Sequence, residues 1–147
     1  DQIQMVIDAD DELSRLFSII ESVPGVGRIS ATEIVITTNE FKNIHDARKY
    51  ACYAGVAPFE HSSGSSIRGK TRISKKANLQ VKTRLHMASL VAAVHYEEFR
   101  LYYQRKVAEG KNKMCVLNAV RNKLVHRIFA CVKENRLYEK NYDPKFG

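Results

Sequence analysis

The chain has 147 residues, of which 44% are hydrophobic and 27% are charged, a composition typical of one globular domain and not of a disordered protein. No apolar run approaches the ~20 residues of a membrane-spanning helix and no secretory signal is present, so we expect a cytoplasmic protein without a membrane partner. Three widely spaced cysteines favour reduced structural thiols, and we expect no metal site within this chain.

The net charge of +8 is unevenly distributed. Residues 1–60 contain ten acids and five bases, whereas residues 61–147 contain six acids and nineteen bases. Between His61 and Tyr96 there is no acid, but there are seven Arg or Lys residues. A basic half predicts a polyanionic partner, and nucleic acid is the expected one. A basic face exposed only to solvent is the alternative.

Residues 1–21 carry apolar side chains at helical spacing and predict one amphipathic helix. Because the chain begins with Asp1 and not with Met, we expect this helix to continue from an upstream region. Residues 22–137 are expected to form the functional domain, and residues 138–147 a tail without periodicity.

A Gly-rich turn between two helices is predicted by SVPGVGRISATEIVI, residues 22–36. Pro24 ends the first helix, and Gly25 and Gly27 permit a tight turn. The pattern resembles a helix-hairpin-helix element, in which backbone N–H groups at a helix start bind a nucleic-acid phosphate. A purely structural turn is the alternative.

The sequence GVAPFEHSSGSSIRGKTRISKK, residues 55–76, follows a short predicted helix that ends at Gly55. Its Ser/Gly part has neither helical nor strand periodicity, so we expect an exposed loop. Such a loop can be a linker, a phosphate-binding loop or the carrier of a reactive serine, and the residues alone leave these three interpretations open.

Ser74 is a suitable N-cap for a long helix that reaches about His95. Its first turn would carry Lys75 and Lys76, which oppose the helix dipole by about 0.3–1 kcal/mol each unless an anion lies between them. Residues 85–94 are apolar on all sides and predict the buried centre of the domain.

Two further amphipathic helices are predicted over residues 96–109 and 112–135. The predicted fold class is therefore mainly α, a compact bundle of about five or six helices. Four bases of the last helix are interpreted as a solvated face, with DNA contact as the alternative: Arg121, Lys123, Arg127 and Lys133.

Four motifs occur in a specific order: VPGVGRISATEIV, ARKYACYAGVAP, SSG and RISKKAN. Together they resemble the C-terminal transposase domain of the insertion-sequence one-hundred-and-ten family, the DEDD/serine bacterial transposases that use a guiding bridge RNA. The resemblance covers residues 22–101. Ala77 and Lys82 depart from the family pattern, which has Gly and Arg more often at these positions.

The resemblance implies that this chain supplies the serine nucleophile of a DNA transposase, which forms a covalent phosphoserine–DNA intermediate. The matched serine is Ser63, with Ser62 as the runner-up. The expected phosphate contacts beyond Gly25 and Gly27 are Gly64, Arg68, Lys70, Arg72, Lys75 and Lys76.

An upstream RNase-H-like domain with four acids is implied to hold magnesium, and DNA, a guide RNA and further copies of the chain are the implied partners. A serine hydroxyl needs a base or a metal to activate it, and the acid-free stretch after His61 offers no local carboxylate. The residues also permit a different class of function, a non-catalytic helix-hairpin-helix module that binds DNA or RNA.

Overall fold

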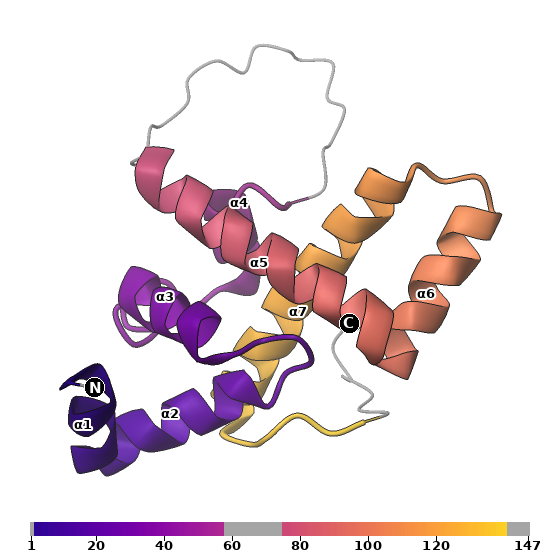
Figure 1. Ribbon diagram of the computed structural model, residues 1–147. Coiled ribbons are helices and arrows are strands. Elements are labelled where there is room, and N and C mark those ends of the chain that lie inside the picture. The colour runs from indigo at the N-terminus through magenta and orange to yellow at the C-terminus, as the bar shows by residue number, and fades with distance from the viewer. Residues whose placement is uncertain (1, 58–74, 141–147) are drawn as a thin grey trace.

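The computed structural model of the protein describes residues 2–57 and 75–140, with side chains from residue 79 onward in the second range. Within these ranges all regular structure is helical, which confirms the predicted mainly α bundle (Figure 1). None of these helices is long and apolar enough to cross a membrane. The elements are α1 (Gln2–Ala9), α2 (Asp11–Glu21), α3 (Arg28–Thr38), α4 (Ala47–Tyr53), α5 (Lys75–His95), α6 (Glu97–Ala108) and α7 (Lys113–Glu134).

The first 21 residues form two helices and not the single helix predicted. Asp10 has an extended backbone, and its carboxylate accepts a hydrogen bond of 3.0 Å from the N–H of Leu13. Aspartate is among the best N-cap residues because its side chain satisfies an N–H group that has no partner within the helix. Asp11 and Glu12 in the first turn of α2 add a favourable interaction with the helix dipole. A new helix therefore begins after Asp10.

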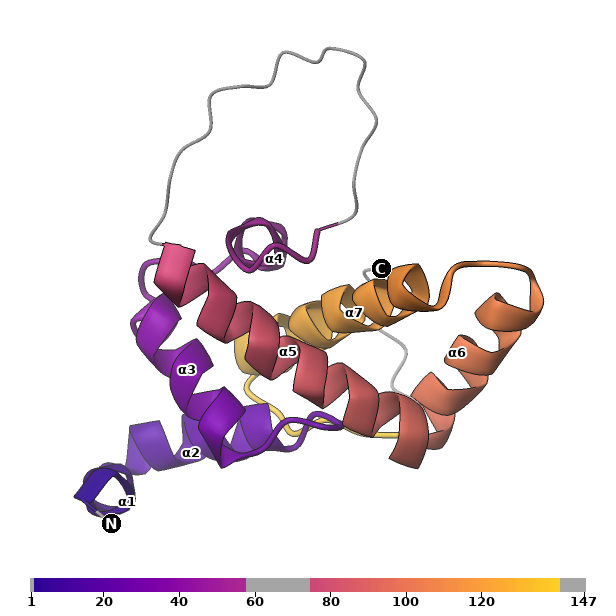
Figure 2. The same ribbon diagram turned by 45° about the horizontal axis from the view of Figure 1, so that its top comes forward.

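Helix α5 is the central element of the bundle. Helices α3, α6 and α7 all pack against it, as the two views in Figures 1 and 2 show. Helix α7 in turn packs against α2, α4 and α6. Helices α5 and α7 together therefore contact each of the helices α2, α3, α4 and α6.

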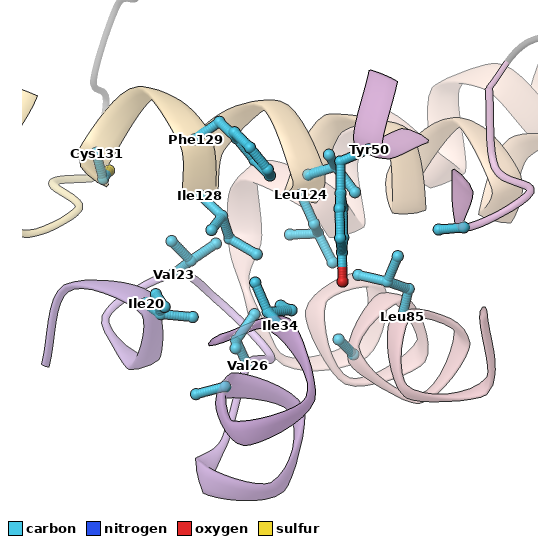
Figure 3. Close-up of a cluster of buried hydrophobic side chains, with 14 of the residues drawn as sticks. Ile20, Val23, Val26, Ile34, Tyr50, Leu85, Leu124, Ile128, Phe129 and Cys131 are labelled. Atoms are coloured by element: carbon cyan, nitrogen blue, oxygen red, sulfur yellow. The ribbon is translucent and has the colours of Figure 1, made fainter. Parts of the chain in front are cut away.

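The hydrophobic core collects side chains from helices that lie far apart in the sequence. Figure 3 shows Ile20 of α2, Ile34 of α3 and Leu85 of α5 close to the α7 side chains Leu124 and Ile128. All five are at most 2% exposed. Burial of such a side chain contributes about 1.5–3 kcal/mol, so this cluster stabilises the packing of α2, α3 and α5 against α7.

Helix α4 is anchored by a buried aromatic residue. The Tyr50 ring lies 5.4 Å from the ring of Phe129 on α7, and its hydroxyl shares a 2.6 Å hydrogen bond with the Thr37 hydroxyl of α3. Burial raises the pKa of Tyr50 far above its ordinary value, so the phenol stays protonated. The short helix that leads toward residue 58 is thus tied to both α3 and α7.

Only one side of α5 is buried, so the prediction that residues 85–94 are buried all round was wrong. Ala88 and Ala92 are at most 2% exposed, whereas Met87, Val91 and Val94 are 53%, 41% and 59% exposed. The packing helices α3, α6 and α7 explain the buried side. No other helix within the described ranges contacts α5 as extensively.

After α7 the chain returns to the α2–α3 turn. The backbone N–H of Tyr138 donates a 2.8 Å hydrogen bond to the Ser22 hydroxyl, and the Tyr138 hydroxyl donates to Glu98 of α6. Glu98 also accepts a 2.7 Å hydrogen bond from the Arg127 guanidinium of α7. Residue 138, predicted to begin a tail, therefore belongs to the packed domain.

Candidate nucleic-acid interface

The predicted nucleophile and most of the predicted basic contacts lie outside the described residues. These are Ser62, Ser63, Gly64, Arg68, Lys70 and Arg72, and the predicted cap Ser74 lies outside as well. Lys75 and Lys76 are the first two residues of α5, as predicted, but their side chains are not described. The structure describes the residues on either side of positions 58–74, which are Ala57 after α4 and Lys75 at the start of α5.

Gly25 fills a position that no other residue fits. Its φ of +83° lies in the left-handed region, and an added Cβ would lie 2.3 Å from the carbonyl oxygen of Ala88. It would also lie 3.3 Å from the backbone nitrogen of Ala92. The α2–α3 turn therefore rests directly on the backbone of α5, and this close approach is sufficient to account for glycine at position 25.

Gly27 has a different environment. It is the N-cap of α3, is exposed, and has an extended backbone with φ −106° and ψ −170°. An added Cβ would have no atom within 4 Å. Helices α2, α4 and α7 are capped by the side chains of Asp10, Asp46 and Asn112, whereas the first turn of α3, like that of α6, has no side-chain cap. Such a helix start is suited to an anion, because its N–H groups carry partial positive charge.

The base next to this turn is already engaged within the protein. Arg28 forms a 2.5 Å ion pair with Glu21 at the end of α2, and its guanidinium lies 5.0 Å from the centre of the Phe17 ring. Arg28 thus clamps α3 to α2. The phosphate contact predicted at this turn therefore depends on the backbone at Gly27.

The exposed cap gives a direct test of that contact. Replacing Gly27 with aspartate should stabilise α3 by about 0.5–1 kcal/mol, because the carboxylate would cap the first turn. The same carboxylate should weaken DNA binding, because it occupies the N–H groups and repels phosphate. Thermal unfolding and fluorescence anisotropy with a labelled duplex measure the two effects. Gly27→Asn is the matched control, since it caps without a charge, and unchanged DNA affinity in both variants would make the turn purely structural.

A hollow of about 490 Å³ lies between the segment after α4, helix α5 and the first half of α7. We call it the Arg121 pocket. Arg121 is only 6% exposed, so its prediction as part of a solvated face was wrong. The pocket is lined by Gly55, Val56, Ala57, Lys82, Met114, Cys115, Asn118, Ala119, Arg121 and Asn122.

Arg121 is held by two neighbours but has no counter-ion among the described residues. Its Nη1 donates a 3.3 Å hydrogen bond to Asn118 Oδ1, and its Nη2 contacts His86 Nδ1. Burial lowers the pKa of Arg121, and burial together with the Arg121 charge lowers the pKa of His86. A neutral His86 can accept from the guanidinium, whereas no described carboxylate forms an ion pair with it.

The α2–α3 turn and the Arg121 pocket contact α5 at different positions along its axis. Gly25 packs against Ala88 and Ala92, whereas the segment after α4 meets α5 at Lys82. Six residues of helix correspond to about 9 Å along the axis. The structure therefore presents two separate candidate anion sites, the start of α3 and the Arg121 pocket, which lie beside different parts of α5.

Sequence reasoning missed the Arg121 pocket because its lining comes from three separate segments. One signal was available in α7. Arg121 stands four residues after Leu117 and three before Leu124, so it occupies the apolar stripe itself. A base on such a stripe is buried, and a buried base requires a partner.

No group of three His, Cys, Asp or Glu side chains that could hold a metal ion exists among residues 2–57 and 79–140.

Comparison with known proteins gives the chain its family. The model of the Transposase IS116/IS110/IS902 family matches residues 17–104. The pilin gene-inverting protein of Moraxella bovis is 26% identical over 140 residues, which cover 95% of this chain and 44% of that protein. The 43.6 kDa protein of insertion element IS110 from Streptomyces coelicolor is 29% identical over 90% of this chain and 33% of its own length.

The transposase for insertion sequence element IS1111A of Coxiella burnetii is 25% identical over 94% of this chain and 37% of its own length. The chain thus spans less than half the length of these relatives. The matched region contains the α2–α3 turn, residues 58–74 and all of α5. The chain therefore belongs to the IS116/IS110/IS902 family of transposases.

Proposed function

We propose that this chain is the serine-bearing domain of a DNA transposase, and that Ser63 is the nucleophile that cuts and joins DNA. The observation that carries the proposal is the family match over residues 17–104, a range that contains the SSG sequence at residues 62–64. The basic half of the chain supports DNA as the partner. One relative is named for the inversion of a pilin gene, which is a rearrangement of DNA.

In the proposed reaction the Ser63 oxygen forms a bond to a phosphorus atom of one DNA strand. The bond from phosphorus to the strand oxygen breaks, and the leaving oxygen takes up a proton to become a free hydroxyl. Attack by another strand hydroxyl on the phosphoserine reverses the exchange and returns the proton to serine. The bond count is unchanged in each step, so the joining step requires no external energy source.

Negative charge builds on the phosphate oxygens during attack, and bases beside the nucleophile stabilise it. Arg68, Lys70 and Arg72 are the proposed bases that follow Ser63, with Ser62 as the alternative nucleophile. Gly64 allows the backbone to approach the strand.

In this proposal the serine hydroxyl is activated by a base or metal in another part of the full-length protein. Residues 62–95 contain no acid that could serve as a local base. We therefore assign the activating base, and any bound magnesium, to another domain. A guide RNA as the selector of the DNA site and an assembly of several copies belong to the same proposal.

The test is to locate the covalent adduct. Full-length protein is incubated with its DNA, quenched in denaturant and digested with trypsin and nuclease. Cleavage after Lys49 and Arg68 gives a peptide of residues 50–68 that contains four serines, and fragment-ion mass spectrometry then identifies the modified one. A nucleotide remnant on Ser63 is the expected result. Strand cleavage without any serine adduct would reject the mechanism.

One observation favours a second function, a helix-hairpin-helix module that binds nucleic acid without cutting it. The exposed Gly27 cap leaves the first turn of α3 without a side-chain partner. Under this alternative the Gly27→Asp variant would lose DNA or RNA binding, whereas replacement of Ser63 would change no activity.

A further inference from the structure

We propose that the Arg121 pocket binds one phosphodiester group of DNA, with Arg121 and Lys82 as its cationic contacts. The inference rests on the proposed function for the identity of the polyanion. It adds a site outside residues 58–74 to the basic contacts that the sequence predicts.

The first argument is an uncompensated buried charge. Arg121 is 94% buried, and none of the described carboxylates pairs with it. Its Nε and the Oδ1 of Asn122 are buried without a hydrogen-bond partner among the described residues. A buried guanidinium with an empty donor is costly, because it has lost water and gained no anion. A phosphate bound in the pocket supplies the missing negative charge.

The second argument is the chemistry of the lining. The charged residues of the pocket are Lys82 and Arg121, and no acid lines it. Asn118 and Asn122 add amide groups to the lining. A pocket of two cations and two amides recognises an anion with several acceptor oxygens.

The third argument is the way in which the wall is built. Asn118 donates a 3.2 Å hydrogen bond to the Val56 carbonyl while it accepts from Arg121, so one amide joins the segment after α4 to the buried cation. Gly55 has a φ of +72°, and an added Cβ there would lie 3.7 Å from Lys82 Cδ and 3.9 Å from Lys82 Nζ. A Cβ would fit at these distances, so the positive φ is what favours glycine here, and the backbone after α4 passes directly beside the Lys82 side chain.

Inorganic phosphate is the first probe. Thermal unfolding of this chain is followed while phosphate replaces chloride at constant ionic strength, because a ligand that binds only the folded state raises Tm. Arg121→Met and Lys82→Gln should each weaken the phosphate effect about tenfold or more, as expected for loss of a charge-assisted hydrogen bond. Lys133→Gln, an exposed base at the far end of α7, is the matched control and should keep the effect.

Without phosphate, Arg121→Met should keep or raise Tm, because an apolar side chain of similar length removes the unpaired charge. A purely structural Arg121 predicts the opposite, a lower Tm in every buffer. An equal phosphate effect in wild type and both pocket variants would overturn the proposal.

A second measurement needs no substitution. Cys115 is exposed and lines the pocket, whereas Cys52 is exposed on α4 outside the lining. A duplex DNA oligonucleotide should slow the alkylation of Cys115 by iodoacetamide about fivefold or more, as ligand occupancy shields a pocket, and leave Cys52 unchanged. Unprotected Cys115 at saturating DNA would overturn the proposal even if Arg121→Met does not fold.

The same assay separates the possible polyanions and the two proposals. Stronger protection of Cys115 by single-stranded RNA of the same sequence would reject DNA as the ligand. Phosphate binding in the pocket together with no serine adduct would retain the site and reject the transposase mechanism. An adduct on Ser63 without protection of Cys115 would reject the pocket site and retain the transposase mechanism.

Discussion

The Ser63→Ala form of the full-length enzyme is expected to lose strand cleavage and joining while it still binds DNA. Removal of a nucleophile lowers the rate by on the order of 10⁶-fold in a well-characterised serine hydrolase, and a similar loss is expected here. The physical reason is that alanine has no hydroxyl oxygen to form the bond to phosphorus. Denaturing gel electrophoresis with a labelled strand measures both the cleaved product and the covalent adduct.

Two neighbouring serines provide the controls for this variant. Ser62→Ala and Ser66→Ala remove the same hydroxyl group within the same SSGSS sequence. Both should retain the adduct, and all three variants should bind the duplex with the affinity of the wild type. Undiminished adduct in Ser63→Ala with loss in Ser62→Ala would move the nucleophile to the runner-up position.

Gly25→Ala is expected to lower the free energy of unfolding by about 3 kcal/mol or more. Two costs add in this variant. The positive φ of +83° disfavours any residue with a Cβ, and the Cβ itself would lie 2.3 Å from the Ala88 carbonyl oxygen. The backbone fixes the position of the Cβ, and the Ala88 oxygen is itself a backbone atom, so neither can rotate away from the other. Thermal unfolding by circular dichroism should show a Tm lower by about 10 °C in a chain of this size.

Gly27→Ala is the matched control for this experiment. It adds the same methyl group two residues later, where φ is negative and no atom lies within 4 Å of the new Cβ. Its cost should stay below about 1 kcal/mol, the usual range for an N-cap change. Equal stability of the two variants would mean that the turn does not rest on α5 as described.

The sequence was sufficient to predict most helices because their starts and ends carry local signals. Pro24 and Gly55 ended helices close to where the structure ends them, and α5 begins at the residue after the predicted cap Ser74. The break at Asp10 was missed although aspartate is itself a cap signal, because apolar spacing continues across it. The exposed side of α5 was missed for a different reason. Uniform apolar composition does not reveal which side of a helix a neighbour covers.

The two candidate sites also differ in whether a local sequence pattern reveals them. The motif around Ser63 is contiguous, so it could be recognised from the sequence alone, and it stays a prediction. The Arg121 pocket joins Val56, Lys82 and Asn118, which are separated by tens of residues. Only the packing of α4 and α7 beside α5 brings them together, and no local pattern encodes that packing.

The hydrogen bond between Tyr138 and Ser22 has a consequence for synthesis on the ribosome. It joins residues 116 positions apart, and Arg15 of α2 likewise donates to Asn135 just beyond α7. The contacts between α2 and α7 therefore close almost the whole chain into one loop, and they form only after the last helix has been translated. Until then the apolar faces of α2 and α5 lack the helix that covers them, so this part of the core is completed last.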